Sequence, residues 1–311
     1  IQIENEYGHV GGLQGPEGEA HIRTLTAIAK EIGFDVPLYT ATGWGGACIG
    51  DLLPVMGGYC EAPWDQRTCE IEPNANFVFS HTRNDALIAC DHHVENANSY
   101  NEEDFPFLTA ELGGGLQVTM HRRPVAKGCD VGAMSTVKMG SGAGLLGYYM
   151  YHGGSNPKGK LSTLQESRAT GYLNDLPEIN YDFNAPIRQY GTISDSYREI
   201  KLLALFLNDF GEDMASLRSE IPTIRILPGD MHTVRTACRH DADHGYVFFN
   251  NYQRRWKMDD HPQVKLEGLL DGKASVGFPA FDLKGGMYGF FPYNMKLNDA
   301  VLQTALATPL C

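Results

Sequence analysis

Short apolar runs alternate with helical patterns along the first two thirds of the chain. The runs that predict strands begin at Ile1, Val36, Leu52, Phe105 and Leu145. Apolar residues spaced by helical turns predict helices over residues 19–32, 85–98, 127–143 and 194–210. Most strand patterns end in glycine-rich stretches. Strands and helices that alternate in this way are typical of parallel βα units.

The number of these units limits the fold. A closed (β/α)8 barrel usually takes roughly 250 residues, and only about four and a half units fit before residue 211. Either the sheet is open, or the first half of a barrel is missing. The chain begins inside a strand pattern and without methionine, which favours the missing half. We therefore expect an α/β fold that is the C-terminal half of a (β/α)8 TIM barrel.

The pattern changes after residue 220. Short alternating runs separated by turns follow, at residues 224–227, 233–236, 245–250 and 263–267. Residues 241–245 read Asp-Ala-Asp-His-Gly, which predicts a hairpin turn. We therefore expect two domains, a partial catalytic barrel over residues 1–211 and an all-β accessory domain over residues 212–311. The chain stops at Cys311 without an evident domain ending, which is compatible with a truncated second domain.

Composition and charge exclude several kinds of partner. Hydrophobic residues make up 42% of the 311 residues, which is enough for packed cores, and charged residues only 20%. The net charge of −13 argues against nucleic acid or an anionic membrane as a partner. A neutral or cationic small molecule is compatible with it. No apolar run approaches the length of a membrane span.

Cysteines and histidines give no sign of a disulfide framework or a metal site. The seven cysteines are irregularly spaced without a C-x-x-C pair, and no N-x-[ST] sequon occurs. Both facts argue mildly against a secreted glycoprotein and slightly favour the cytoplasm. The adjacent His92 and His93 cannot both face one ion on a regular helix. No nucleotide-binding glycine motif occurs. We expect no metal and no cofactor.

Two glutamates carry the candidate chemistry. Glu6 and Glu111 each end an apolar strand pattern and precede glycines, which we expect to leave room above the carboxylates, and Asn5 lies directly before Glu6. Enzymes with barrel folds place their reacting groups at the carboxyl ends of the strands. A pair of carboxylates there suits glycoside hydrolysis, and retention of configuration needs them roughly 5–5.5 Å apart. Alternatively, strand-end acids only cap a following helix or pair with arginine.

Aromatic residues at predicted strand ends fit a sugar ligand. They are Trp44, Tyr59, Trp64, Tyr149 and Tyr151. Flat rings stack on the apolar faces of sugars, and phenol hydroxyls can orient a carboxylate. Core packing is the alternative for about half of them. Strand alternation puts Tyr149 and Tyr151 on one side and Tyr148 on the other. The basic pair Arg122 and Arg123 could rim an acidic pocket, but surface ion pairs are expected.

Four segments resemble the family 35 glycoside hydrolases, the retaining β-galactosidases. Residues 1–8 (IQIENEYG) are similar to the family's acid/base motif on the fourth barrel strand. Residues 105–114 (FPFLTAELGG) resemble the seventh-strand nucleophile segment, and residues 149–156 the eighth strand. Residues 181–191 (YDFNAPIRQYG) resemble the stretch that follows. In addition, residues 245–254 are similar to a strand of the β domain behind the barrel.

The resemblance implies a role for each candidate residue. It implies Glu6 as acid/base, Glu111 as nucleophile and Asn5 as the partner of the sugar 2-hydroxyl. Tyr59, on the sixth strand, and Tyr149, on the eighth, are implied as substrate-binding residues. Phe183, also expected to bind substrate, stands where many members have tyrosine. Leu112 and the following glycines depart from the aromatic residues of animal members, which leaves the aglycone side open.

The expected function is therefore hydrolysis of terminal non-reducing β-D-galactosyl residues by double displacement. The expected partner is a β-galactoside oligosaccharide or glycoconjugate. The alternatives are an exo-β-glucosaminidase or exo-galactanase of the same fold, or a non-catalytic carbohydrate-binding relative. For this chemistry Glu6 should have a raised pKa and Glu111 should stay ionised. Half a barrel would leave two sheet edges open, so the chain alone is expected to aggregate or to be inactive.

Overall fold

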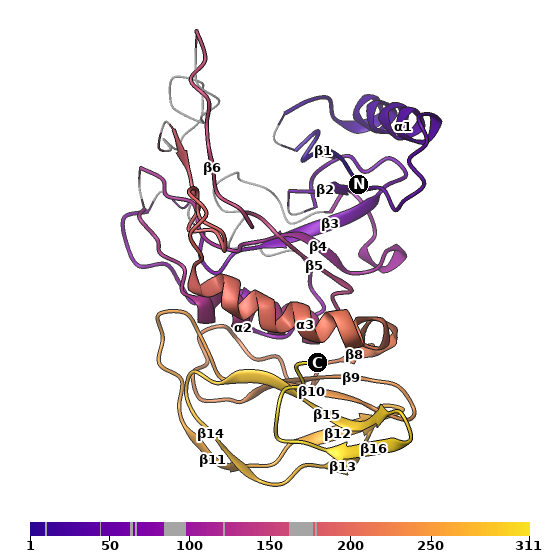
Figure 1. Cartoon of the computed structure of the whole chain (residues 1–311), viewed down its shortest axis with the longest axis vertical. Helices are drawn as coiled ribbons and strands as arrows, with labels where there is room; N and C mark the ends of the chain where they lie inside the picture. Colours follow the sequence, from indigo (N-terminus) through magenta and orange to yellow (C-terminus); the bar gives the residue numbers. More distant parts are fainter. Residues whose placement is uncertain are drawn as a thin grey trace.

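The computed structural model describes residues 1–9, 11–43, 45–62, 65, 67–83, 98–120, 122–161, 177 and 179–311. Figure 1 shows a parallel sheet at one end of the molecule, an antiparallel sheet at the other, and helices α2 and α3 between them. The expected mixture of an α/β part and a β part is confirmed at this level. The predicted helix over residues 85–98 lies almost wholly outside the described residues, together with His92 and His93.

The parallel sheet has five strands in the described part of the chain. Their order in space is their order in sequence, β1-β2-β3-β4-β5. Each neighbouring pair is parallel. The strands are β1 (Gln2–Asn5), β2 (Tyr39–Ala41), β3 (Leu53–Gly58), β4 (Leu108–Leu112) and β5 (Leu145–Tyr148). All of their carboxyl ends therefore lie along one edge of the sheet.

The helices match the sequence periodicity closely. They are α1 (Gly15–Glu31), α2 (Gly128–Gly140) and α3 (Asp195–Ser216), with short 3₁₀ helices at Ala75–Phe77 and Glu102–Asp104. Gly33 follows α1 with a φ of 98°, and the amide of Phe34 donates to Ala29 O (3.1 Å). This arrangement closes the helix and needs a residue that tolerates a positive φ. Gly33 therefore caps the C-terminal end of α1.

The antiparallel part contains one large sheet and two small ones. The large sheet has the order β16-β15-β10-β9-β8. Its strands are β8 (Arg218–Glu220), β9 (Arg235–His240), β10 (Gly245–Asn250), β15 (Tyr288–Leu297) and β16 (Ala300–Thr304). The two-stranded sheets pair β11 (His261–Val264) with β14 (Phe281–Leu283), and β12 (Glu267–Leu270) with β13 (Lys273–Gly277). A further short pair joins β6 (Gly154–Ser155) to β7 (Asn180–Tyr181).

The turn prediction in this part is correct, and one strand prediction is wrong. Gly245 pairs with His240, so residues 241–244 form the hairpin turn between β9 and β10. Residues 224–227 form no strand, although their apolar residues alternate. Pro222 and Pro228 flank them, and proline lacks the amide that a strand ladder needs.

Helix α2 is buried on all sides because it lies between the two parts. Every residue of α2 except Cys129 is buried, and Val137 packs in one apolar core with Phe206 of α3, Phe248 and Phe290. The rings of Phe206 and Phe290 are 4.7 Å apart, and those of Phe248 and Phe290 are 5.1 Å apart. Such aromatic packing fastens α2 and α3 to the antiparallel sheet.

The first strand is more exposed than its apolar pattern suggests. The strand β1 is largely exposed, with only Ile3 partly buried. On α1, Ile22 and Ala29 are buried, whereas Ile28 is 47% exposed, and Ile32, which follows the helix, is 67% exposed. The reason is position, because β1 is an edge strand of the described sheet and has a neighbour on one side only.

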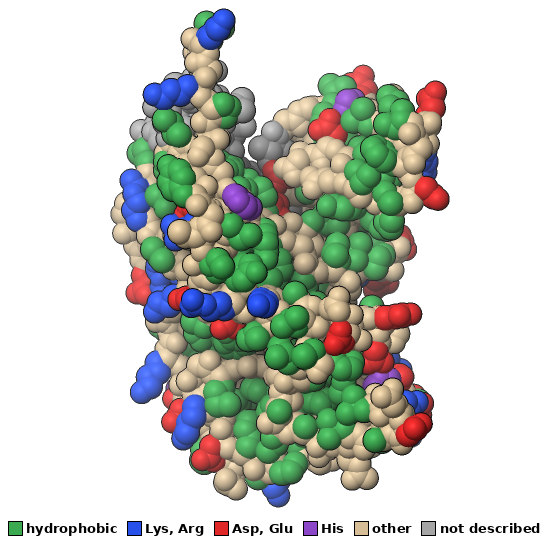
Figure 2. Space-filling view, viewed as in Figure 1, with side chains coloured by type: hydrophobic (Ala, Val, Ile, Leu, Met, Phe, Trp, Pro, Cys, Tyr) green, Lys and Arg blue, Asp and Glu red, His purple; other side chains and the backbone are tan. Residues whose placement is uncertain are grey.

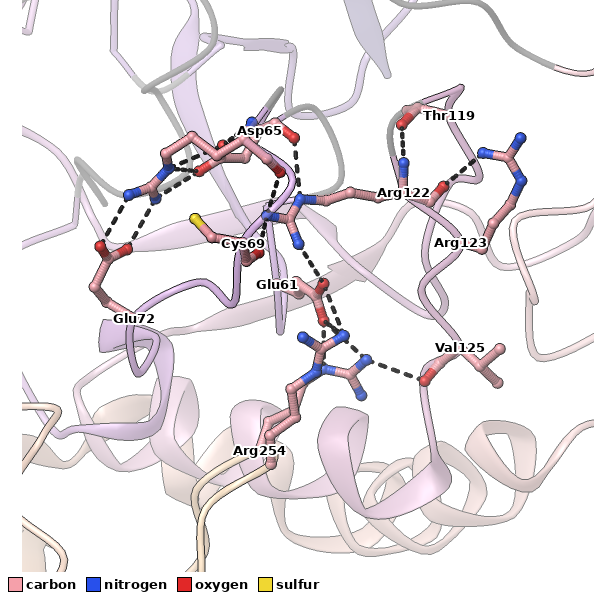
Figure 3. A network of polar contacts seen from close by, with 11 residues as sticks. Glu61, Asp65, Cys69, Glu72, Thr119, Arg122, Arg123, Val125 and Arg254 are labelled. Carbon is pink, nitrogen blue, oxygen red and sulfur yellow. Dashed lines mark hydrogen bonds and ion pairs between the residues drawn. The ribbon is translucent and has the colours of Figure 1, made fainter.

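A buried cluster of charges joins the two parts (Figure 3). Arg254 follows β10 and reaches Glu61, which follows β3, with Nε 3.0 Å from Oε2. Its Nη1 also pairs with Asp130 of α2. Arg122 and Arg255 add contacts to Glu61, at 3.8 and 3.0 Å. The predicted surface ion pairs of Arg122 are therefore wrong, because its side chain is only 9% exposed.

Two general features concern the described residues only. Within them, no helix is both long and apolar enough to cross a membrane. The described cysteines, which leave out Cys90, are free thiols.

Candidate active site

Glu111 is held beside Tyr59 by the register of two adjacent strands. Glu111 is the fourth residue of β4, one position earlier than the strand end that we expected, and it pairs with Gly57 of β3. Tyr59 directly follows β3 and is fully buried. Its hydroxyl donates to Glu111 Oε1 over 3.3 Å. The parallel register thus brings a phenol donor to the carboxylate from the neighbouring strand end.

Glu6 directly follows β1 and has an unusual backbone conformation. Its φ is 53°, in the left-handed region that a non-glycine residue rarely adopts. Its amide donates to Ala41 O of β2 (2.9 Å) and its carbonyl accepts from His9 N (2.9 Å). A backbone held in this region costs about 1–3 kcal/mol, and such residues gather at functional sites.

Gly43 allows Glu6 and His9 to lie close to the end of β2. A Cβ atom on Gly43 would be 3.0 Å from Glu6 Cγ and Cδ, and 2.5 Å from His9 Cδ2. Gly43 has a φ of 54°, which also favours glycine. His9 was not among the residues that sequence reasoning selected. The sequence feature that could have identified His9 is its position, three residues after Glu6.

The two glutamates act on each other electrostatically. Burial first, and then the negative charge of Glu6, raise the pKa of Glu111 to about 8, although the hydrogen bond from Tyr59 lowers it. Glu111 keeps some exposed surface, but protein atoms closely surround its carboxyl group. Burial first, and then the charge of Glu111, raise the pKa of Tyr59 well above its ordinary value, so Tyr59 stays a hydrogen-bond donor.

This distribution of charge differs from the expectation. The sequence-based mechanism requires an ionised Glu111 and a raised pKa at Glu6. The pKa of Glu111 is instead raised, because its carboxyl group is enclosed by protein and is affected by the negative charge of Glu6. Glu111 therefore favours its protonated form near neutral pH.

Removal of the Glu111 carboxyl should stabilise the fold at alkaline pH. The folded-state pKa of about 8 exceeds the ordinary value of 4.5. The resulting stability is complete below about pH 4.5 and is lost as the pH rises through about 8. Glutamine does not ionise, so Glu111→Gln does not lose this stability. Its free energy of unfolding should exceed that of wild type by on the order of 3 kcal/mol above pH 8. Urea unfolding at about pH 5 and about pH 9 measures the difference.

The matched control for this measurement is Glu103→Gln. Glu103 is an exposed glutamate of the chain segment that precedes β4. Its replacement should leave the pH dependence of unfolding as in wild type. If Glu111→Gln and wild type differed in unfolding free energy by the same amount at acid and alkaline pH, the raised pKa of Glu111 would be contradicted.

Tyr149 and Phe183 meet in an aromatic group near these residues. Tyr149 directly follows β5, and its amide donates to Leu112 O (2.8 Å). Its ring lies edge-on to Phe183 at 5.4 Å, and its hydroxyl is 2.8 Å from that of Tyr181. The Tyr149 hydroxyl also contributes to the raised pKa of Tyr59. Tyr59 thus contacts Glu111, Tyr149 lies near Tyr59, and Phe183 contacts Tyr149, although their roles as substrate ligands stay predictions.

The strand predicted over residues 145–151 ends at Tyr148, so the alternation predicted for Tyr149 and Tyr151 does not apply. The Tyr148 hydroxyl donates to Ser135 Oγ of α2 (2.9 Å). Tyr151 is 39% exposed. Tyr181 was quoted in a motif but not selected as a site residue. Its hydrogen bond to Tyr149 and its ring contact with Phe183 (4.8 Å) make it part of the group.

The glycines after Glu111 bring segments together. A Cβ on Gly115 would lie 2.1 Å from Phe183 O, and one on Gly114 would lie 2.5 Å from Met150 O. We expected these glycines to leave room above the carboxylate. Instead, the absence of side chains lets the backbones of three segments approach each other closely.

The remaining residues selected from the sequence are Asn5 and the tryptophans. The Asn5 side chain is exposed and accepts a hydrogen bond from Gln2 Nε2 (2.9 Å). Its contact in the described structure is thus within β1, and its role toward a sugar stays a prediction. Trp44 and Trp64 lie outside the described residues.

A cavity of about 180 Å³ adjoins the aromatic group. Its lining mixes aromatic, amide and charged side chains and includes Gln117, Tyr181, Asp182, Phe183, Asn184 and Arg188. Such a mixture suits a polar ligand with apolar faces. Figure 2 shows that this end of the molecule is hollowed between α1 and the arm that carries β6.

The arrangement can perform acid–base chemistry. Two carboxylates influence each other, one holds a proton near neutral pH, and a buried phenol donates to it. Within the described residues, no group of three or more His, Cys, Asp or Glu side chains is arranged to hold a metal ion. A scan against protein-family models and a search of curated proteins found no match to this chain.

Proposed function

We propose that this chain belongs to a retaining β-galactosidase in which Glu111 is the nucleophile and Glu6 the acid/base. The observation that carries the proposal is the electrostatic contact of Glu6 and Glu111 at the strand ends of one parallel sheet, with Tyr59 donating to Glu111. Paired carboxylates of this kind are the requirement of glycoside hydrolysis. The family resemblance of the four barrel segments supports galactose as the sugar.

The sheet order supports the second half of a (β/α)8 barrel as the fold, from strand four onward. Strands follow one another in sequence order, as in a barrel, whereas doubly wound sheets reverse their order at a switch point. Strands three places apart in a flat sheet would be separated by about 14 Å. Glu6 after β1 nevertheless raises the pKa of Glu111 on β4, which favours a curved sheet. The exposed edge strand β1 fits a further strand beside it.

The reaction follows from the positions of the two carboxylates. Glu111 attacks the anomeric carbon while Glu6 protonates the leaving oxygen, which breaks the glycosidic bond and forms a galactosyl-enzyme ester. Glu6 then deprotonates a water molecule that attacks the same carbon and releases Glu111. Two inversions give net retention.

The proton has to change place before this reaction. The raised pKa of Glu111 favours its protonated form, but attack requires Glu111 ionised and Glu6 protonated. The hydrogen bond from Tyr59 favours the ionised form of Glu111. We propose that a substrate oxygen beside Glu6 completes the transfer by providing an acceptor for the Glu6 proton.

A panel of nitrophenyl glycosides tests the function with the full-length protein. The β-D-galactoside should be cleaved, and proton NMR should show β-galactose as the first product. The α-galactoside serves as the control and should not be cleaved. Preference for a β-glucosaminide, or cleavage restricted to galactan, would identify the related exo-glycosidases instead. Sugar binding without turnover on every substrate would overturn the catalytic proposal.

A further inference from the structure

A continuous set of buried hydrogen bonds runs from the antiparallel sheet to Tyr59. It begins at Gln253, just after β10, whose Nε2 donates to Asn74 O over 3.1 Å. The Asn74 side chain donates to Tyr59 O over 3.0 Å. The Asn76 side chain donates to the same oxygen over 2.9 Å. Tyr59 then donates its hydroxyl to Glu111.

Gln253, where this set of hydrogen bonds begins, is held in place by Arg235. Arg235 of β9 donates from Nη1 to Gln253 Oε1 over 2.7 Å, and the same nitrogen is 3.0 Å from Phe77 O. Asn250 of β10 donates to Phe77 O as well, over 2.6 Å. Two strands of the antiparallel sheet therefore hold the segment 74–77 from one side.

These hydrogen bonds are buried, so the loss of any one of them costs free energy. Gln253, Asn76 and Arg235 are each 1% exposed, and Tyr59 is fully buried. A buried amide that loses its partner costs about 1–3 kcal/mol, so such groups keep their geometry. The Tyr59 carbonyl accepts two of these amides, and the ring of the same residue supplies the donor to Glu111. Movement of the carbonyl therefore moves the hydroxyl.

We propose that Gln253, Asn74 and Asn76 are positioning residues that hold Tyr59 against Glu111. The antiparallel sheet would then be part of the candidate active site and not only an accessory domain. Their side chains hold the Tyr59 carbonyl directly or through Asn74, so they act on Glu111 through Tyr59. The expected effect on kcat rests on the proposed function, whereas the expected effect on the titration of the Glu111 carboxyl does not.

The test compares Gln253→Ala with Asn251→Ala. Both residues are buried amides of one short segment, and each donates to a backbone carbonyl. Asn251 Nδ2 donates to Asp259 O (2.8 Å), which lies in the antiparallel part. Gln253→Ala also removes the acceptor of Arg235 Nη1, so it should lose more stability in urea than Asn251→Ala. Only Gln253→Ala should lower kcat on the nitrophenyl β-galactoside, by about tenfold with little change in KM.

A second readout does not depend on turnover. The ¹³C signal of the Glu111 carboxyl, assigned with Glu111→Gln, should titrate at higher pH in Gln253→Ala, because the lowering effect of Tyr59 weakens. Glu6 and Tyr149 also influence this region, but neither is changed. Asn251→Ala should leave the titration as in wild type.

A double-variant cycle with Tyr59→Phe separates positioning from general destabilisation. If Gln253 acts through the Tyr59 hydroxyl, Gln253→Ala should change the Glu111 titration little further once that hydroxyl is absent. An equal effect in both backgrounds, or an unchanged titration in Gln253→Ala, would overturn the inference. Wild type that cleaves no β-galactoside would overturn the proposed function alone, because the titration would still report on the positioning.

Discussion

Replacement of Glu111 by alanine should lower kcat on a nitrophenyl β-galactoside by about 10⁴-fold or more. The variant lacks the carboxylate that forms the ester intermediate, and nothing in the described site offers a second nucleophile at that position. The measurement is steady-state turnover of the full-length protein at saturating substrate. Glu103→Gln, an exposed change, is the control and should keep wild-type turnover.

Azide then distinguishes the role of Glu111 from that of Glu6. In Glu111→Ala, azide can enter the space of the lost carboxylate and should give α-galactosyl azide. In Glu6→Ala, the galactosyl-enzyme still forms from a good leaving group, and azide should attack its other face to give β-galactosyl azide. A raised pKa is the property expected of an acid/base, and Glu111 has one, so this comparison decides between the two assignments of roles.

Two results would contradict the assignment. Near-normal activity of Glu111→Ala would exclude it as the nucleophile. β-Galactosyl azide from Glu111→Ala, together with α-galactosyl azide from Glu6→Ala, would exchange the two roles while leaving the retaining mechanism in place.

Replacement of Arg254 by methionine should destabilise the fold by about 3 kcal/mol. The change leaves two carboxylates, Glu61 and Asp130, without a shared cation, and their side chains are only 5% and 0% exposed. A buried charge without its partner typically costs about 3–5 kcal/mol. Arg122 and Arg255 still contact Glu61, which argues for the lower end of that range. Urea unfolding at neutral pH measures the loss.

An exposed ion pair provides the matched control. Arg198 of α3 pairs with Asp195 at 2.9 Å, and both side chains are more than two-thirds exposed, at 75% and 79%. Arg198→Met should change the unfolding free energy by less than about 1 kcal/mol because solvent screens the pair. Equal losses in the two variants would show that the buried cluster adds nothing beyond an ordinary surface contact.

The local features of the fold followed from the sequence. The helices α1, α2 and α3, the cap at Gly33 and the hairpin turn after His240 all depend on residues within a few positions of each other. Periodicity and turn chemistry report such short-range preferences directly. The same reasoning placed Glu6 and Glu111 at or next to strand ends, because a strand's boundary is a local property.

The environment of those residues depended on distant parts of the chain. Tyr59 meets Glu111 across 52 positions, and Arg254 meets Glu61 across 193. No periodicity encodes such pairs, since they follow from sheet register and from packing of α2 between the two parts. For the same reason, the sequence did not show that the glycines after Glu111 bring backbones together.

The sequence by itself therefore determined which chemical groups stand at the carboxyl ends of the strands, because strand boundaries and residue types are local. Only the tertiary structure decided that the pKa of Glu111 is raised, because a carboxyl pKa depends on burial and on neighbouring charges that the fold brings together. It likewise decided that Tyr59 is tied to the antiparallel sheet through Asn74 and Gln253, because those contacts exist only once the two parts of the chain have packed against each other.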